Sequence, residues 1–263
     1  MAVVAVSASP HPHLSLSISV PISSSSRAGR PHLPVPFCYH YQRLVAEVSQ
    51  LCETPVSVAA IDNSALNIAE ALSEDELWAA VWLRIRAFHV FGKSFGIEHL
   101  KRNLAKRDFQ ALKEGIAGKR KGFARVSCIN ATLPLSHIMS LSHDLCTQCK
   151  FSENGEDRVV IGTLDLKCSR LPDGITGLKA KGIAAGSARA YLSNVCVAKE
   201  LRRNGLGYEL IAKAKKVAED WGITHFHVLV AASNEPAKKL YVKSGFVYES
   251  DEPAVGVWFP DQP

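Results

Sequence analysis

A turn in the carboxyl-terminal part of the chain has residue types that bind a pyrophosphate group. Arg202 and Arg203 are followed by Gly205 and Gly207, where an apolar, strand-like run gives way to a helical pattern. A helix N-terminus leaves backbone N–H donors unpaired and carries partial positive charge. Glycines let a phosphate approach the backbone closely, and arginines add forked, charged donors. The turn therefore predicts a pyrophosphate cradle.

Two better-known phosphate loops do not match this turn. A Walker A loop would end in Gly-Lys-Ser or Gly-Lys-Thr, which is absent here, and the dinucleotide fingerprint would need a glycine where Leu210 stands. Two glycines and two arginines before a helix can also form an ordinary turn. The turn taken alone leaves both interpretations open.

The segments around the turn alternate between strand-like and helix-like patterns, which predicts an α/β fold. Ser73 and Glu76 have the spacing of a capping box, which opens an amphipathic helix. Long connections are expected at 134–157 and 169–189. We expect helices at about 73–91, 98–115, 206–221 and 234–245, and strands at 123–133, 158–167, 191–197, 225–230, 246–249 and 255–259.

Two segments of this region resemble the GNAT superfamily of N-acetyltransferases. The acetyl-CoA loop of that family, Arg/Gln-x-x-Gly-x-Gly/Ala, is matched by 202–207, and its later signature, Asn-x-x-Ala-x-x-Leu-Tyr-x-x-x-Gly-Phe, is met in full by 234–246. The family's strand before the loop ends in Val-x-Pro, whereas this chain has Ala198 in place of the proline. The residues Asn-Glu-Pro-Ala-Lys-Lys-Leu-Tyr of the later signature look most like the plastid branch of the plant enzymes.

The resemblance implies a fold and a cosubstrate. The fold is a mixed central β-sheet with splayed middle strands, flanked by helices. Acetyl-CoA would lie in the gap between the strands at 193–197 and 225–231, and a backbone N–H near Val195 or Cys196 would polarise its thioester carbonyl. The residues that the resemblance assigns to acetyl-CoA are Val195, Cys196, Val197, Arg202, Arg203, Asn204, Gly205, Leu206, Gly207, Tyr208, Asn234, Glu235, Pro236 and Tyr241.

The resemblance also gives Tyr241 a catalytic role. In the family the acceptor amine attacks acetyl-CoA directly, and the tyrosine of the later signature protonates the departing thiolate. A phenol with a pKa of about 10 can donate to a thiolate whose conjugate acid has a pKa of about 8.5. The alternative for Tyr241 is an aromatic side chain that only packs on a helix face.

The resemblance suggests Tyr191 as the general base. Bacterial relatives that modify protein N-termini carry a glutamate five residues before the signature asparagine, where this chain has Leu229. Some eukaryotic N-terminal acetyltransferases place a tyrosine eleven residues before the first loop arginine, which is Tyr191 here. Those enzymes pair that tyrosine with a histidine at the position of Leu229. His227 lies two residues earlier on the same strand face, and a lone strand histidine is more often a packed or surface residue.

The expected acceptors are protein or peptide amines, either α-amino groups, lysine side chains or both. A small arylalkylamine is the alternative acceptor, and a non-catalytic acetyl-CoA-binding protein is the alternative function. The long connections would shape the acceptor pocket, so the motifs do not choose among these acceptors. They do not set an oligomeric state either.

The first part of the chain has the composition of an organellar transit segment. The first acidic residue is Glu47, and residues 1–46 contain nine serines and six prolines with only three arginines. We expect residues 1–55 to be a disordered transit segment and 60–263 to be the acetyltransferase domain. Plastids are the expected destination, with the nucleus or cytosol as additional locations. The alternative is a disordered tail that has no targeting function.

Composition argues against several other classes. The 31 Lys and Arg against 25 Asp and Glu give a formal charge of +6, too dispersed for a nucleic-acid binder. No apolar stretch is long enough to span a membrane. Seven irregularly placed cysteines argue against a disulfide scaffold. Cys146 and Cys149 form one Cys-x-x-Cys near His137 and His143, but a single pair with irregular histidine spacing does not favour a metal site. A reducible thiol pair or inert loop residues are the alternatives.

Overall fold

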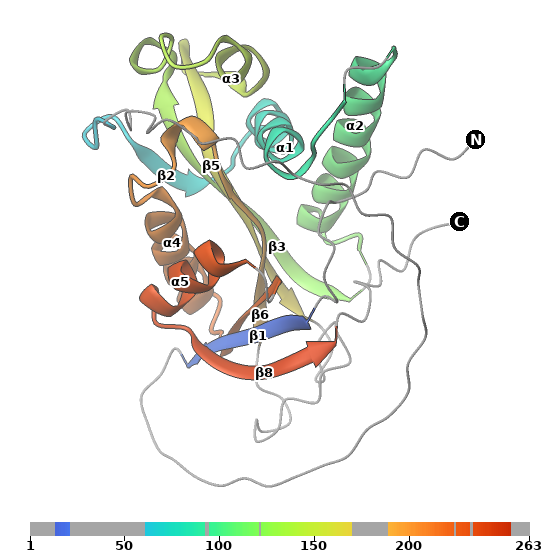
Figure 1. Cartoon of the computed structure of the whole chain (residues 1–263), viewed down its shortest axis with the longest axis vertical. Helices are drawn as coiled ribbons and strands as arrows, with labels where there is room; N and C mark the ends of the chain where they lie inside the picture. Colours follow the sequence, from blue (N-terminus) through green and yellow to red (C-terminus); the bar gives the residue numbers. More distant parts are fainter. Residues whose placement is uncertain are drawn as a thin grey trace, which may run out of the picture.

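The computed structural model describes residues 14–21, 61–92, 95–120, 122–169, 189–223, 225–231 and 234–253 (Figure 1). The strands in this part of the chain are β1 Leu14–Pro21, β2 Asn67–Glu70, β3 Phe123–Pro134, β4 Lys150–Glu153, β5 Glu156–Ser169, β6 Arg189–Val197, β7 His225–Ala231 and β8 Val247–Pro253. The helices are α1 Glu74–Phe88, α2 Ile97–Ile116, α3 His143–Gln148, α4 Leu206–Asp220 and α5 Glu235–Lys243, with short 3-10 turns η1 Leu135–His137 and η2 Lys199–Leu201.

The strands form one mixed sheet with helices on both faces. Its order is β2-β3-β5-β6-β7-β1-β8, and β4 pairs with β5 beside this path. On β5, Thr163 bonds to Arg84 of α1, whereas its neighbour Gly162 lies against Leu210 of α4. Because adjacent strand residues point to opposite faces, α1 and α4 cover opposite sides of the sheet, as Figure 1 shows.

The core lies on both sides of β5. Val160, Ile161, Leu164 and Leu166 are all fully buried, which explains why this strand reads as a nearly continuous apolar run. On the α1 side, Trp78 packs edge-on against the ring of Phe109 with 5.2 Å between ring centroids, and this contact joins α1 to α2.

The local signals at helix ends are largely confirmed. The Ser73 hydroxyl accepts from the Glu76 amide at 3.1 Å, as a capping box requires. The Glu76 carboxylate, however, accepts from the Leu72 amide at 3.1 Å, so the reciprocal bond is made one residue earlier than expected. Gly222 and Gly245 both adopt left-handed φ angles, of 70° and 85°, just after α4 and α5.

The segment 134–157, expected as a long connection, is mostly ordered secondary structure. It holds η1, α3 and β4, and it ends inside β5. β4 and β5 form a hairpin whose two-residue loop is Asn154 and Gly155, with φ angles of 51° and 82°. Two left-handed residues are what a tight hairpin turn needs, and Asn-Gly supplies them readily. Residues 170–188, within the second expected connection, and the strand expected at 255–259 lie outside the described residues.

One strand lies within the segment expected to be a disordered transit peptide. β1 pairs antiparallel with both β7 and β8, with Ser19 opposite His227 on one side and Val247 on the other. The structure thus places eight residues of the expected transit segment inside the sheet. Residues 1–13 and 22–55 lie outside the described part of the chain, and the assignment of 1–55 as a transit segment stays a prediction.

Candidate active site

The turn that precedes α4 leaves its backbone open. Gly205 caps the helix with a left-handed φ of 81°, which glycine adopts without strain. A Cβ atom at this position would meet no atom within 4 Å. The amides of Tyr208 and Glu209 donate to the Gly205 carbonyl at 2.8 and 3.1 Å. The amides of Leu206 and Gly207, in the first helical turn before them, have no acceptor within the helix and can bind an anion.

The two glycines of the turn have different roles. A Cβ atom on Gly207 would lie 3.0 Å from Cδ2 of Leu240, so this glycine lets α4 and α5 pack closely. The Cβ position of Gly205 faces open space, whereas that of Gly207 faces α5. The Arg202 side chain donates to the Val197 carbonyl at 3.3 Å, which ties the turn to the end of β6. Arg203 has a φ of 71°, and both arginines are exposed beside the open backbone.

β6 and β7 separate just before this turn, which confirms the expected splay. Their parallel pairing ends at Leu192 opposite Val228, and no later rung joins them in the described part of the chain. Along its other edge β6 bulges, since Asn194 and Val195 together oppose the single residue Leu164 of β5. Asn194 has a left-handed φ of 54°, which is uncommon outside glycine. Residues 193–197 therefore present a strand edge to the gap.

Tyr191 and His227, which the sequence singled out separately, lie together. They are partners across the last paired rungs of β6 and β7, and their rings stack with 5.5 Å between centroids. His227 is buried and Tyr191 is half-buried. Leu229 follows His227 by two residues, where the strands have already parted. An aromatic pair thus stands at the point from which the gap opens.

The helix α5 carries the second group of expected site residues. The Asn234 side chain caps the helix by accepting from the Ala237 amide at 3.1 Å, with Pro236 in the first turn. Tyr241 is only 5% exposed, and its ring packs on Phe246 with 5.5 Å between centroids. Burial raises the pKa of the Tyr241 phenol to about 12, so the group stays protonated at any working pH.

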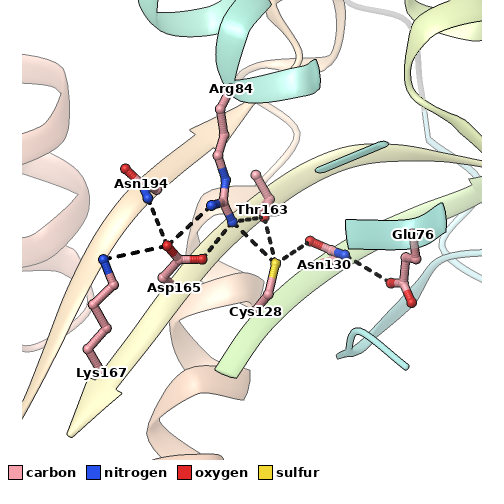
Figure 2. Close-up of polar contacts among 8 residues, drawn as sticks. All are labelled: Glu76, Arg84, Cys128, Asn130, Thr163, Asp165, Lys167 and Asn194. Carbon is pink, nitrogen blue, oxygen red and sulfur yellow. Dashed lines mark hydrogen bonds and ion pairs between the residues drawn. The ribbon is translucent and has the colours of Figure 1, made fainter. Parts of the chain in front are cut away.

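A buried polar cluster adjoins the bulge of β6, and Figure 2 shows its members pointing toward one another. The Arg84 guanidinium contacts Oδ1 of Asp165 at 2.6 Å and Oδ2 at 3.2 Å. The Asn194 amide donates to the same Oδ2 at 2.7 Å, and the Lys167 ammonium lies 3.7 Å from it. Arg84 and Asp165 are 5% and 2% exposed. Burial alone would raise the pKa of Asp165, but the charges of Arg84 and Lys167 lower it below its usual range.

The sequence offered a signal for this cluster that its motifs did not include. Arg84 interrupts the apolar run Val-Trp-Leu-Arg-Ile of α1, and Asp165 interrupts Ile-Gly-Thr-Leu-Asp-Leu of β5. A single charge in an apolar segment needs a partner of opposite sign when it is buried. Because the two charges have opposite signs, the sequence alone could have suggested that Arg84 and Asp165 form a buried ion pair.

Two cavities lie on the α1 face of the sheet. The smaller, about 150 Å³, is lined by Asn194, Asp165 and Lys167 together with Asp108 of α2. The larger, about 340 Å³, lies beside the turn that precedes α4 and is lined by Arg202, Lys199, Arg86, Lys101 and Asp144 among others. His89, just after α1, lines both. The segment expected to shape an acceptor pocket thus contributes Asp144 of α3 to the larger cavity.

The thiols that the sequence singled out do not form an exposed pair. Cys149 is fully buried, and burial raises its pKa well above the usual range of a thiol. Cys146 donates to the Ile138 carbonyl at 3.3 Å. Cys196 is also buried, with its pKa raised to about 12, which suits packing rather than nucleophilic attack. The described residues contain no cluster of three or more metal-ligating side chains.

Comparison with known proteins places these features in a family. A family model described as "Acetyltransferase (GNAT) family" matches residues 140–246, which include β5, β6, α4, β7 and α5. GCN5-related N-acetyltransferase 7, chloroplastic, from Arabidopsis thaliana is 54% identical over 229 residues, which cover 86% of this chain and 82% of the relative. GCN5-related N-acetyltransferase 6, chloroplastic, from the same plant is 30% identical over 67% of this chain and 60% of the relative.

Solved structures match the chain at lower identity. An aminoglycoside N-acetyltransferase, AAC(6')-Iy in complex with CoA, is 15% identical, and the match covers 73% of this chain and 92% of that chain with a TM-score of 0.44. Among the described residues, no helix is long and apolar enough to cross a bilayer.

The open turn, the splayed strands and the extent of the sequence identity agree with one another. The chain belongs to the GCN5-related N-acetyltransferase family and is an acetyl-CoA-dependent N-acetyltransferase with the mixed α/β fold of that family.

Proposed function

We propose that the chain acetylates protein amines in plastids, taking α-amino groups, lysine ε-amino groups or both. The observation that carries the choice of acceptor is the pair of cavities that share His89, because together they extend beyond the space that one amine needs. The smaller cavity would hold the acceptor amine beside Asn194. The larger cavity would hold the next residues of the acceptor peptide. A small arylalkylamine is the alternative acceptor, and acetyl-CoA binding without catalysis is the alternative function.

The residues around the gap fit acetyl-CoA. Val195 and Val197 offer a free strand edge to an extended pantetheine arm, and Gly205 offers an open helix start to a pyrophosphate. Acetyl-CoA supplies the acetyl group as an activated thioester. The remaining cofactor contacts that we propose are Cys196, Arg202, Arg203, Asn204, Leu206, Gly207 and Tyr208 around the turn, and Asn234, Glu235, Pro236 and Tyr241 on α5.

The bulge of β6 supplies the electrophilic contact. We place the donor at the backbone N–H near Val195 or Cys196, which lies in the part of β6 that β7 no longer covers. A fixed N–H donor aimed at the carbonyl oxygen stabilises the negative charge that develops there. The donor needs no side chain, so the backbone path at this point decides its direction.

Tyr191 would remove the proton from the acceptor amine. An α-amino group has a pKa of about 8 and is partly neutral near that pH, whereas a lysine, with a pKa of about 10.4, depends more on a base. The ring of His227 stacks on Tyr191, and this pair lies one residue before the pairing of β6 and β7 ends. The position of the family's bacterial glutamate is Leu229, so that residue cannot share the task.

Tyr241 would donate to the sulfur of the leaving thiolate. Its pKa of about 12 makes it a weaker acid than an exposed phenol. A closed site would also raise the pKa of the leaving thiol, because burial disfavours its thiolate. Donor and leaving group therefore shift in the same direction, and proton transfer between them is penalised less than the shift of Tyr241 alone implies.

The first prediction tests the cofactor turn. We expect Gly205→Glu to weaken acetyl-CoA binding at least about 100-fold more than Gly205→Gln, because unit charges about 4 Å apart near a protein surface repel by about 4 kcal/mol. Both side chains impose the same left-handed strain, so the glutamine variant is the matched control. Isothermal titration on variants with unchanged circular dichroism measures the difference. Equal affinities in the two variants would contradict the pyrophosphate assignment.

The second prediction concerns Tyr241. Tyr241→Phe keeps the buried ring and removes the proton, so turnover should fall about 100- to 10,000-fold while acetyl-CoA affinity stays nearly constant. Because the phenol has a pKa of about 12, it stays protonated over the working range, and the wild-type rate should show no alkaline decline from this group. Single-turnover acetylation with peptide acceptors, from about pH 6.5 to about 9.5, is the measurement. A rate within about threefold of wild type, with chemistry limiting, would exclude the donor role.

The third prediction tests the acceptor and the base together. The mature protein is incubated with acetyl-CoA and a mixed peptide library, and acetylated α- and ε-amines are mapped by mass spectrometry. We expect transfer to peptides, and we expect Tyr191→Phe to slow lysine acetylation more than α-amine acetylation, since a lysine needs deprotonation more. Transfer only to small arylalkylamines would favour the alternative acceptor. No transfer to any amine, with normal acetyl-CoA binding, would favour the non-catalytic alternative.

The fourth prediction concerns the targeting of the chain. The two Arabidopsis relatives are both named as chloroplastic. A fluorescent protein fused behind residues 1–60 should enter plastids in leaf cells, whereas one fused to 60–263 should not. The N-terminus of the imported full-length chain, read by mass spectrometry, tells whether β1 stays with the working enzyme. A purely cytosolic signal from the first fusion would refute the transit assignment, whereas a nuclear signal beside the plastid signal would not.

A further inference from the structure

The polar cluster of Figure 2 is anchored inside the protein and ends at its surface, on the bulge of β6. Asp165 is buried between the sheet and α1, whereas Asn194 is exposed. The 2.7 Å hydrogen bond from the Asn194 amide to Asp165 is the link between the two. Asn194 is also the residue with the left-handed φ of 54° in the bulge. The cluster therefore reaches the backbone at the point where β6 leaves β7.

The buried side of this link has little freedom to move. Arg84 contacts both oxygens of Asp165, and it also donates to the Thr163 hydroxyl at 3.0 Å and to the Cys128 sulfur at 3.2 Å. These bonds tie α1, β3 and β5 to one carboxylate. Asp165 is thus held in one orientation, with the oxygen Oδ2 directed at Asn194.

Stability alone gives a weak reason for this arrangement. A buried ion pair seldom stabilises a fold more than a well-packed apolar pair of the same size, because both charges must be removed from water. A left-handed asparagine is also less favourable than a left-handed glycine. The chain keeps both features side by side, at the strand edge that its chemistry needs. Both features meet at Asn194 in the bulge.

We propose that Arg84 and Asp165 are positioning residues, which hold the side chain of Asn194 and thereby keep the following N–H of the bulge aimed at the thioester carbonyl. The inference rests on the proposed function of this site as an acetyl-transfer site. Asp165 does not touch the acetyl group in this arrangement. It acts through Asn194, whose backbone sets the path of Val195.

The test uses an apolar replacement of the whole pair in the full-length protein. Arg84→Met with Asp165→Leu removes the two closest charges together. Lys167 loses its anion, but burial already lowers the pKa of this lysine, so it can shed its proton and the fold should persist. We expect turnover to fall about 10- to 100-fold, since a misdirected oxyanion donor costs that much or more. CoA affinity should stay within about threefold of wild type, because CoA lacks the carbonyl that the donor meets.

Two readouts do not depend on activity. The preference for acetyl-CoA over CoA in calorimetry should diminish, and a crystal structure of the double variant should show φ of Asn194 outside the left-handed region. The matched control is Glu76→Gln, which changes a buried acid that bonds to Asn130 at 2.9 Å on the far side of the cluster. It should lower the melting temperature without changing turnover or the acetyl-CoA preference.

A second variant decides the outcome if the double variant does not fold. Asn194→Gly allows the left-handed φ but removes the link to Asp165, so turnover should again fall. A folded double variant with wild-type turnover and unchanged φ at Asn194 would overturn the proposal, as would wild-type turnover in Asn194→Gly. If the wild type transfers acetyl to no amine, the proposed function fails. The φ angle and the acetyl-CoA preference still test the positioning in that case.

Discussion

The parallel pairing of β6 and β7 ends at Leu192 and Val228, and the rest of the site depends on that ending. The backbone groups along a strand inside a sheet normally form hydrogen bonds with the adjacent strand. Here the strands diverge, and the bulge at Asn194 turns the β6 backbone away from regular pairing with β5 as well. The chain thereby gains a free strand edge in the interior of the sheet, with helices on both faces to enclose it. An extended ligand can occupy that edge as a strand would.

The turn after β6 completes this geometry because it begins where the free edge ends. Val197 is the last residue of β6, and the Arg202 side chain returns to its carbonyl. Gly205 then starts α4 with open space in front of it, while Gly207 brings α4 against Leu240 of α5. A ligand that pairs with the strand edge is therefore led directly to a helix N-terminus. That continuity supports the proposed acetyl-CoA site, in which one short segment would hold both an uncharged arm and a pyrophosphate.

The sequence predicted the elements whose signals are local. Gly205, Asn234 and Gly245 mark a helix start, a helix cap and a helix end, and each depends only on neighbouring residues. The β4–β5 hairpin was also signalled locally, by Asn154 and Gly155, but the segment's Ser, His and Cys content suggested a loop instead. The pairing of β1 between β7 and β8 depends on distant partners, so no local pattern could predict it.

The buried cluster could not be predicted from motifs for a related reason. Arg84 and Asp165 lie 81 residues apart in the sequence, and neither belongs to a short pattern. Their charges come into contact only because α1 packs over β5 in the folded chain. With Lys167 protonated, the cluster of Arg84, Asp165 and Lys167 carries one net positive charge.

A net positive charge would favour both the attacking amine and the oxyanion that develops on the carbonyl. A positive surrounding disfavours an ammonium and favours the neutral amine that must attack. It also favours the negative charge that develops on the carbonyl oxygen. Burial lowers the pKa of Lys167, so its charge weakens sooner than that of Arg84 as the pH rises. Arg84 keeps its proton throughout, but its charge is balanced by Asp165, so the net positive charge at the bulge is that of Lys167. Arg84 thus orients Asp165, whereas Lys167 sets the net charge of the cluster beside Asn194.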